Sequence, residues 1–397
     1  MKPTKIYAEM IDSIALEQFE NAMSLPCNVQ GALMPDAHAG YTLPIGAVIK
    51  SRQMVFPSYV GYDIGCGMCA VKLDIFKEDI DLERLKKEII KAIPLGMSRH
   101  QTKQPYVPLT CTPKAQEMFD EIGAYQLGTL GGGNHFIELG SGNDGKVWIV
   151  IHSGSRGFGK NIAEYYMKLA AMSHVLMDEW REAFEKSHMD FKKHNPEKYE
   201  IALASYLEKQ KASTAKTHLE KHVGFSITST EGKEYLLDME CALAFALENR
   251  KRMIDTIISL LGNPKELLFI NRNHNHAEIK EAFVIHRKGA THAEEGMLGV
   301  IPGNMRDGSF IVKGKGNEAS LCSSSHGAGR VLSRNQAFLA LNVDQFHNDM
   351  LGICTNHTDK MLDESPRAYK DIFEVMALQK ELVDVIDHVK PFLNIKG

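Results

Sequence analysis

The sequence predicts a single α/β domain that carries a helical insertion, and two observations predict this fold class. Short apolar runs rich in β-branched residues lie between glycines and prolines toward both ends of the chain, which is typical of strands. Residues 161–222 contain few glycines and many Lys, Glu, Ala and Met, which is typical of helices. Because no repeat, low-complexity run or linker divides the chain, we expect one domain over residues 1–397, with a mainly helical insertion over residues 161–262.

The first half of the chain contains three predicted strands and one predicted helix. The segment LPIGAVIK at 43–50 is apolar, β-branched and bounded by Pro and Gly, and CAVKLDI at 69–75 has a similar character. Residues 80–93 place apolar side chains at helical spacing. The strand expected at 146–153, KVWIVIHS, runs directly into a glycine-rich turn, where functional side chains often lie.

Helices dominate the predicted middle of the chain. We expect two helices within residues 161–222, separated at His194-Asn195-Pro196 because an Asn-Pro pair favours a turn. A long amphipathic helix follows over residues 234–261, and Gly262-Asn263-Pro264 ends it.

The last part of the chain returns to strands and then to one more helix. Residues 267–330 read as short strands separated by glycine turns. Residues 366–389 are expected to form a last helix, because four apolar residues recur at helical spacing: Ile372, Val375, Leu382 and Ile386.

Composition limits the class of protein. The chain has 397 residues, 44% of them hydrophobic, which is enough for a large core. The net charge of -4 shows no overall basic excess, so a nucleic-acid enzyme on this chain must concentrate its positive charge in a cleft. The seven cysteines are odd in number and scattered, which argues against a disulfide framework and favours a reducing cytoplasm. We see no signal peptide, and no apolar run reaches the roughly 18 residues of a membrane span.

Five islands of Gly, His, Cys, Asp and Asn lie at predicted strand ends. In VGYDIGCGMC, at 60–69, Asp63 and Cys66 flank a glycine turn that can direct both side chains at one metal ion. The Cys-Gly-Met-Cys spacing leaves a structural zinc half-site, a redox pair or a buried cysteine as alternatives, although no second C-x-x-C completes a zinc ribbon.

The second and third islands combine glycine turns with polar side chains. GTLGGGNHFIEL, at 128–139, lets the backbone approach a ligand closely and carries Asn134, His135 and Glu138, but its spacing fits neither a P-loop nor a dinucleotide fingerprint. In IHSGSRGFGKN, His152 ends a strand, and Arg156 with nearby backbone N–H groups can hold a phosphate. A histidine at a strand end is, however, more often a satisfied polar group than a ligand.

The remaining islands supply further histidines and cations. His274 and His276 would share one face of a strand, and the alternative is a pair of surface histidines on a loop. In SLCSSSHGAGRVLSR, at 320–334, a glycine turn exposes His326, and histidine can act as a covalent nucleophile. Four cations are candidate phosphate ligands: Arg156, Lys288, Arg330 and Arg334. Together the islands suit two metal ions about 3.5–4 Å apart that promote displacement at phosphorus.

These segments resemble the RtcB family of tRNA-splicing RNA ligases. The matching segments occur in family order and cover nearly the whole chain: MPDAHAGYTLPIGAVI, VGYDIGCGM, LGTLGGGNHFIE, HSGSRGFG, HRKGA, SSSHGAGRVLSR, DESPRAYKD and NIKG. The resemblance implies a single α/β domain of the α+β type, in which packed β-sheets surround a central cleft and helices lie outside.

The resemblance also implies a metal centre and a nucleophile. Two Mn²⁺ ions would share the thiolate of Cys66, although ligand softness alone favours zinc. One ion would bind Asp63, Cys66 and His135, and the other would bind Cys66, His152 and His274. His326 matches the histidine that becomes guanylylated by GTP.

The nucleotide and RNA contacts follow from the same resemblance. The positions that match GTP contacts are Asn134, Glu138, Asn304, Ser309, His326, Gly327, Ala328, Gly329, Tyr369 and Lys396. The four cations named above would bind triphosphate or RNA phosphates. The chain departs from the usual pattern at Pro302-Gly303-Asn304-Met305-Arg306-Asp307 and at Thr291-His292-Ala293-Glu294, and His276 matches no family role.

The implied activity joins an RNA 3′-phosphate or 2′,3′-cyclic phosphate to a 5′-hydroxyl, in RNA repair or tRNA splicing, through a histidine–GMP adduct and an RNA–ppG end. One alternative caps DNA or RNA 3′-phosphates with GMP without sealing. Others are a metal-dependent phosphodiesterase and a sensor of RNA ends. We expect a cytoplasmic, monomeric protein without membrane contact, and an activator protein of the archease type as a partner.

Overall fold

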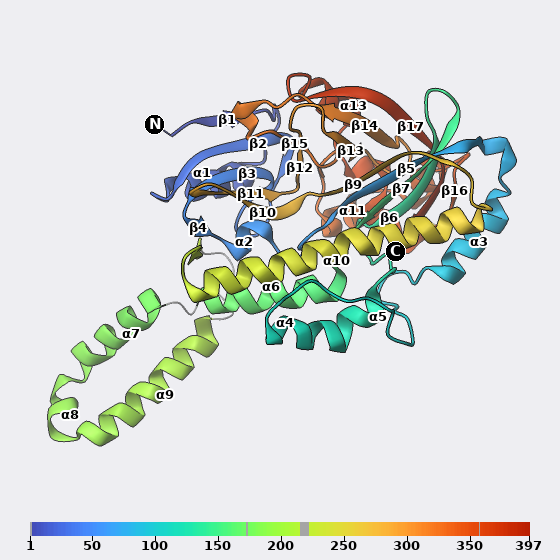
Figure 1. The fold of residues 1–397 in the computed structure, drawn as a ribbon. Coiled ribbons are helices and arrows are strands. Elements are labelled where there is room, and N and C mark those ends of the chain that lie inside the picture. The colour runs from blue at the N-terminus through green and yellow to red at the C-terminus, as the bar shows by residue number, and fades with distance from the viewer. Residues whose placement is uncertain (1, 172–173, 215–221, 357) are drawn as a thin grey trace.

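The computed structural model describes residues 2–171, 174–214, 222–356 and 358–397. Helices and sheets are mixed along the chain in one α+β domain, as the sequence predicted (Figure 1). Two larger sheets form its body, one of five strands and one of eight, and two small sheets of two strands each accompany them.

The five-stranded sheet joins the start of the chain to a hairpin far along the sequence. Its order is β1 (Thr4–Ile6), β2 (Asn28–His38), β3 (Ile45–Arg52), β11 (Phe283–Lys288) and β10 (Asn275–Lys280). Helix α1 (Ser13–Ser24) begins where the Asp12 side chain accepts a hydrogen bond from the Ile14 N–H. Its buried Phe19 packs with Leu33 and Ile49, which fixes the helix on this sheet.

The eight-stranded sheet is antiparallel along its main path and curls strongly. Its order is β13 (Leu298–Pro302), β14 (Ser309–Gly314), β17 (Val383–Lys396), β6 (Phe136–Ser141), β7 (Lys146–Ser153), β5 (Gly67–Phe76) and β9 (Glu266–Asn273), with β16 (Cys354–Thr355) beside β17. The curl brings β13 against β5 and β9, the strands at the far end of this order. Met68, Trp148 and Ile311 are buried together on its inner face.

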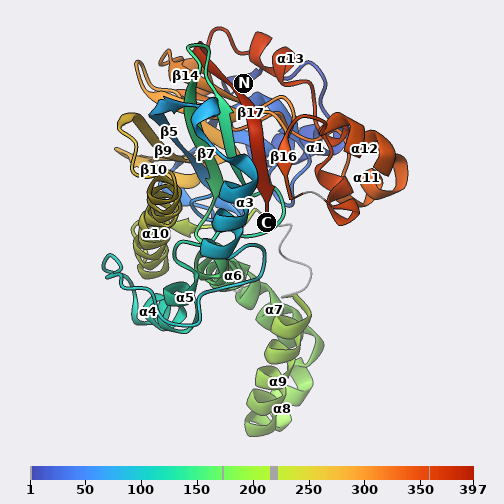
Figure 2. The ribbon, with the colours of Figure 1, turned by 90° about the vertical axis from the view of Figure 1, so that its right-hand side faces the viewer.

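The small sheets pair β12 (Ala290–His292) with β15 (Ser323–Ser325) and β4 (Met54–Val55) with β8 (Phe225–Ser226). Short helices occur at α2 (Pro57–Val60), α4 (Pro113–Met118), α5 (Ala124–Gln126), α11 (Arg334–Ala340), α12 (Val343–Asp349) and α13 (Ile372–Ala377). Figure 2 shows α11 and α12 on the side of the sheet opposite to α10.

Long helices cover the outer face of the eight-stranded sheet (Figure 2). Helix α3 (Leu82–Ala92) and helix α10 (Thr230–Leu260) bury Leu85, Ile89 and Ile257 against strand residues such as Ile149. Helix α6 (Arg156–Ala171) lies against α10. Among the described helices, none combines the length and the apolar composition that crossing a bilayer requires.

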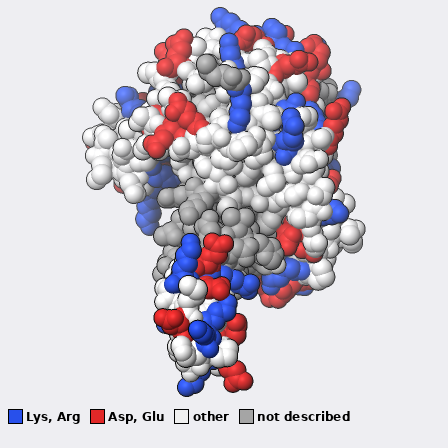
Figure 3. Space-filling model, turned by 90° about the vertical axis from the view of Figure 1, so that its left-hand side faces the viewer, with Lys and Arg blue, Asp and Glu red and all other residues white. Residues whose placement is uncertain are grey.

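Three helices extend away from the sheets as an arm (Figure 1): α7 (His174–Ser187), α8 (Met189–His194) and α9 (Pro196–Thr214). Acidic and basic side chains alternate over its surface (Figure 3), which is typical of a solvated helical hairpin. The break expected at His194-Asn195-Pro196 is confirmed, but the described part of residues 161–222 holds more than the two helices that we predicted.

The other predicted elements are mostly confirmed. The strands expected at 43–50, 69–75 and 146–153 correspond to β3, β5 and β7. The helices expected at 80–93 and 234–261 correspond to α3 and α10.

The last helix was predicted wrongly. Only Ile372–Ala377 is α-helical within 366–389, and residues from Val383 onward form β17. The apolar spacing was ambiguous because Val383, Val385 and Val389 also fit an extended chain. Pairing with β14 and β6 satisfies the strand's backbone on both sides, which decides in favour of the strand.

Candidate active site

The metal-ligand candidates meet at one edge of the eight-stranded sheet. Cys66 directly precedes β5, His135 directly precedes β6, His152 lies near the end of β7 and His274 directly follows β9. These four strands are neighbours, and His152 is paired with Met68 on one side and Phe136 on the other. In antiparallel strands the start of one and the end of the next share an edge, so the fold assembles residues that are distant in sequence.

The side chains at this edge converge on a small buried space. The Cys66 sulfur lies 3.1 Å from Nε2 of His152 and 3.5 Å from Nε2 of His135. Asp63 Oδ2 lies 3.1 Å from the same His135 nitrogen. Nε2 of His274 lies 3.3 Å from Nε2 of His152. The ligand atoms of Cys66, His135 and His152 therefore lie close enough to hold one metal ion, and Asp63 and His274 each contact one member of this group.

Backbone carbonyls orient two of these rings. Nδ1 of His135 donates to the Leu130 carbonyl at 3.0 Å, and Nδ1 of His152 donates to the Asn134 carbonyl at 3.2 Å. A proton held on Nδ1 leaves the Nε2 lone pair available for a cation. Nδ1 of the buried His274 has no hydrogen-bond partner among the described residues.

Burial favours the uncharged forms of His152, His274 and Cys66. Desolvation, with the charges of neighbouring imidazoles, lowers the pKa of His152 and of His274 well below the usual value. Burial and the neighbouring Asp63 carboxylate raise the pKa of the Cys66 thiol. Neutral imidazoles are the ligand form, and a divalent ion supplies the positive charge that a buried thiolate lacks. The donor set therefore fits a metal centre.

His326 lies next to this cluster and is held by Asp36. Its ring centre is 4.9 Å from that of His274. Nδ1 of His326 lies 2.6 Å from Asp36 Oδ2, which also accepts from the backbone N–H groups of His326 and Gly327. Burial would raise the pKa of Asp36, but the charge and hydrogen bond of His326 outweigh it and lower the pKa. The pairing directs Nδ1 to Asp36 and leaves Nε2 as the second ring nitrogen.

The glycine turn after His326 is required by the close approach of β2. Gly329 has φ +77°, and a Cβ at this position would lie 2.3 Å from the Asp36 carbonyl oxygen. Any side chain there would push the turn off β2 and separate His326 from Asp36.

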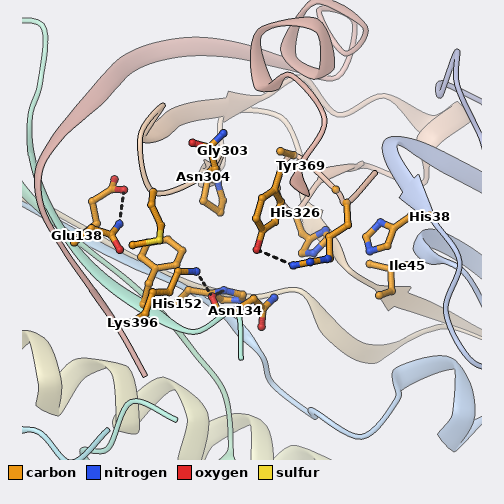
Figure 4. Close-up of a pocket in the computed structure, with 18 of the residues that line it drawn as sticks. His38, Ile45, Asn134, Glu138, His152, Gly303, Asn304, His326, Tyr369 and Lys396 are labelled. Carbon is orange, nitrogen blue, oxygen red and sulfur yellow. Dashed lines mark hydrogen bonds between the residues drawn. The ribbon is translucent and has the colours of Figure 1, made fainter. Parts of the chain in front are cut away.

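A cavity of about 310 Å³ opens beside His326 (Figure 4). Most of the predicted GTP contacts line it: Asn134, Glu138, Asn304, His326, Gly327, Ala328, Gly329, Tyr369 and Lys396. Arg330 and Arg334 line it as well. Ser309 is absent from the described lining, but its hydroxyl donates to Glu138 Oε1 at 2.9 Å. We call this space the nucleotide cavity.

Glu138 lies in the nucleotide cavity away from His326 (Figure 4). Only 1% of it is exposed, and burial raises its pKa to about 8 despite the Ser309 hydroxyl and the Lys396 charge. Asn394 Nδ2 donates to its other oxygen at 3.4 Å. A carboxyl group with so few donors can accept further hydrogen bonds from a ligand.

Glu364 organises the cationic wall of the same cavity. Its oxygens accept from Lys396 Nζ at 2.6 Å, from the Tyr369 hydroxyl at 2.7 Å and from Arg334 at 2.8 Å. Arg330 lies 3.4 Å away and Arg334 also pairs with Asp363. Burial opposes ionisation of Glu364, yet the Lys396 and Arg334 charges lower its pKa.

A second cavity of about 630 Å³ meets the first at His326, and we call it the larger cavity. Asp63, Cys66, His274 and Lys288 line it. Lys288 donates to the Ser58 carbonyl at 3.3 Å, and burial lowers its pKa to about 8. His326 is therefore reachable from two sides.

Two residues with predicted ligand contacts, Arg156 and Asn304, donate hydrogen bonds to other groups of the protein. Arg156 is absent from the described lining of both cavities, and it donates to Thr129 Oγ1 and to the Gly96 carbonyl. Asn304 lines the nucleotide cavity, but its amide donates to Asp307 within its own loop. The phosphate and GTP roles of these two residues stay predictions.

The histidines of NRNHNH diverge. His274 lies between β9 and β10 rather than within a strand, whereas His276 lies in β10 and its ring stacks on that of His292, with ring centres 4.6 Å apart. Both are buried, so neither is a surface histidine. Glu278, His292 and Glu294 lie close enough for a metal ion. Arg287 and Lys280 already neutralise these two glutamates, which favours an ion-pair network there.

Sequence reasoning missed two groups of this site. Asp36 and His38 lie in the MPDAHAG segment, and burial lowers the pKa of His38 to about 4. Asp363 and Glu364 begin the DESPRAYKD segment. The available signal was that these ionisable residues lie inside two of the segments that match the family.

Comparison with known proteins agrees with this geometry. A family model described as tRNA-splicing ligase RtcB matches residues 18–113 and 107–397. The RNA-splicing ligase RtcB of Escherichia coli K12 is 31% identical over 100% of this chain and 97% of its own length. The tRNA-splicing ligase RtcB of Nanoarchaeum equitans is 26% identical over 100% of this chain and 95% of its own length. The match spans every island that forms the two cavities, and the chain belongs to the RtcB family.

Proposed function

We propose that the protein is a GTP- and Mn²⁺-dependent RNA ligase. It joins an RNA 3′-phosphate, or a 2′,3′-cyclic phosphate after its hydrolysis, to a 5′-hydroxyl through GMP bound to His326. The observation that carries the proposal is the position of His326, which borders both cavities and lies 4.9 Å from His274 of the ligand cluster. The names of the relatives, RNA-splicing and tRNA-splicing ligases, support the same activity.

The ligand cluster would hold two ions. In this proposal Asp63, Cys66 and His135 would hold one ion, and Cys66, His152 and His274 would hold the other. When bound, such ions offset negative charge that develops on phosphate oxygens.

His326 performs the first step. Its Nε2 forms a bond to the α-phosphorus of GTP, and the bond from that phosphorus to the β-phosphate oxygen breaks, so pyrophosphate leaves. Asp36 accepts the Nδ1 proton in a hydrogen bond and stabilises the positive charge that the ring gains. The Glu138 carboxylate accepts hydrogen bonds from the guanine edge, and Lys396, Arg330 and Arg334 lie along the wall for phosphates.

The activated GMP then passes to RNA. An oxygen of the RNA 3′-phosphate attacks the GMP phosphorus, the bond to Nε2 breaks, and an RNA–ppG end results. The 5′-hydroxyl of a second RNA then attacks the RNA 3′-phosphorus and loses its proton to solvent. The bond from that phosphorus to GMP breaks, and GMP leaves. RNA enters through the larger cavity, where Lys288 and the two arginines supply positive charge for its phosphates.

The test is a covalent label on one residue. The protein is incubated with Mn²⁺ and GTP labelled at the α-phosphate, and the adduct is mapped by mass spectrometry. Wild type and His194→Ala, a control in the exposed arm, retain label, and His326→Ala loses it. Label that persists in His326→Ala overturns the nucleophile. If RNA ends are capped with GMP but are not joined, the protein is a capping enzyme and not a ligase.

Other expectations stay predictions: the domain boundaries at 161–262, the cytoplasmic location, the monomeric state and an activator of the archease type. Size-exclusion chromatography with light scattering checks the oligomeric state. Comparing ligation with and without an archease-type protein checks the need for an activator.

A further inference from the structure

An exposed aromatic ring stands at the rim of the larger cavity. Tyr41 lies in the loop between β2 and β3, and 71% of it is exposed. Among the described residues that line this cavity, the exposed large apolar side chains are Tyr41 and Val331. Single exposed apolar residues are ordinary on protein surfaces, so position and support decide whether this ring has a role.

The loop that carries Tyr41 is held in place by α1. Gln18 Nε2 donates to the carbonyl oxygens of Gly40 and Tyr41 at 2.9 and 2.8 Å, and Gln18 Oε1 accepts from the Gly40 N–H at 3.1 Å. A Cβ at Gly40 would lie 2.3 Å from the Leu43 carbonyl oxygen, so the turn also excludes larger residues there. The backbone that presents Tyr41 is therefore ordered before any ligand arrives.

A second tyrosine supports the ring. Tyr41 and Tyr62 meet edge to face, with ring centres 5.8 Å apart and planes 87° apart. Tyr62 is partly buried against a core cluster and directly precedes Asp63 of the ligand cluster. The supported ring therefore lines the same cavity as Asp63 and His326, while most of its surface stays accessible.

The surroundings of Tyr41 have the composition of a single-strand nucleic-acid site. The same cavity is lined by Lys288, Arg330 and Arg334 and leads to His326. Cations that follow the backbone, with aromatic rings for the bases, are the recurring arrangement for unpaired RNA. Stacking uses the face of a base, which every nucleotide has, so this arrangement tolerates any sequence.

We propose that Tyr41 is a stacking platform for the nucleobase at the RNA end that enters the larger cavity. The inference rests on the proposed ligase function and names how that site holds its RNA. Tyr41 contributes to positioning the end and takes part in no bond that forms or breaks. The base belongs either to the strand with the 3′-phosphate or to the strand with the 5′-hydroxyl.

The test uses RNA with 2-aminopurine either at the last nucleotide before the 3′-phosphate or at the first nucleotide after the 5′-hydroxyl. Stacking on a tyrosine quenches this fluorophore. We expect quenching by wild type and Tyr41→Phe at one of the two positions, and loss of it in Tyr41→Ala. Phe269→Ala, which removes an exposed ring from β9, is the matched control and keeps the quenching.

Kinetics supply the second measurement. Tyr41→Ala should raise the KM for RNA about tenfold, whereas Tyr41→Phe stays near wild type. An abasic nucleotide at the quenched position should raise the wild-type KM by a similar factor and have little further effect on Tyr41→Ala.

The two levels of the proposal fail differently. If wild type forms no adduct with GTP, the ligase function fails. If wild type forms the adduct and joins RNA, but Tyr41→Ala keeps the wild-type KM or the quenching at both positions, the ligase function stands and the stacking platform is overturned.

Discussion

Asp36 Oδ2 lies 2.6 Å from Nδ1 of His326, although the two residues are 290 positions apart in the sequence. Because the same oxygen also accepts two backbone N–H groups, the carboxylate has little freedom to turn away. The orientation of the His326 ring is therefore fixed at Nδ1 by a residue of β2.

Replacement of this carboxylate should slow formation of the adduct. Asp36→Asn keeps the size of the side chain but removes the charge and permits the wrong ring tautomer. We expect the rate of protein guanylylation to fall on the order of 10²–10⁴-fold, by analogy with the orienting aspartate of a catalytic triad. Quench-flow with labelled GTP measures it, with the exposed Asp344→Asn as control. An unchanged rate would remove Asp36 from the proposed mechanism.

GTP binding should depend on pH through Glu138. Burial raises the pKa of this group from 4.5 to about 8, so it is mostly protonated at neutral pH when the cavity is empty. The guanine N1–H and N2–H groups favour the carboxylate, so binding should release a proton and weaken as the pH falls below about 8. Calorimetry in buffers of different ionisation enthalpy measures the proton count. Glu138→Gln should abolish the proton release, and a similar release in that variant contradicts the assignment.

The same group has a consequence for stability. Its pKa is higher in the folded chain than in the unfolded chain, so the folded state binds more protons between about pH 4.5 and 8. The contribution of Glu138 to the free energy of unfolding should therefore decrease as the pH rises through this window. Urea unfolding of wild type and Glu138→Gln, measured across this pH window, compares their free energies of unfolding. If the two free energies change in parallel with pH, Glu138 does not make the expected contribution.

Replacement of Glu364 should lower the free energy of unfolding. Its pair with Lys396 is almost fully buried, with 3% and 5% of the side chains exposed. Glu364→Gln leaves the Lys396 charge without its partner, which costs about 3 kcal/mol in comparable pairs. The double variant with Lys396→Met should recover part of this stability in urea unfolding. If the two losses simply add, the pair is not coupled.

Metal binding should stabilise the protein through Cys66. Mn²⁺ at 100 times its dissociation constant should add about 2.7 kcal/mol to the free energy of unfolding. The effect should disappear in Cys66→Ala and persist in Cys354→Ala, which removes a partly buried cysteine from β16. A chelator should abolish both the stabilisation and protein guanylylation. Elemental analysis after dialysis separates manganese from zinc, which the sulfur and nitrogen ligands also suit.

Much of the site was visible in the sequence because its parts follow local rules. Apolar, β-branched runs predicted β3, β5 and β7, and islands of Gly, His, Cys, Asp and Asn marked Cys66, His135 and His152. Two further islands held His274 and His326, the family resemblance implied the roles of these residues, and the fold does bring all of these side chains together.

Tertiary structure alone decided the rest, because partners distant in sequence are not encoded by local spacing. Residues 383–389 fit a helix or a strand equally well, and pairing with β14 selected the strand. Asp36 of β2 became part of the site through its contact with His326, and Glu364 through its contact with Lys396 of β17. Arg156 donates instead to the Thr129 hydroxyl and the Gly96 carbonyl. The chemical inventory was thus readable from the amino-acid order, whereas the partner of each charge depended on which surfaces the fold buried together.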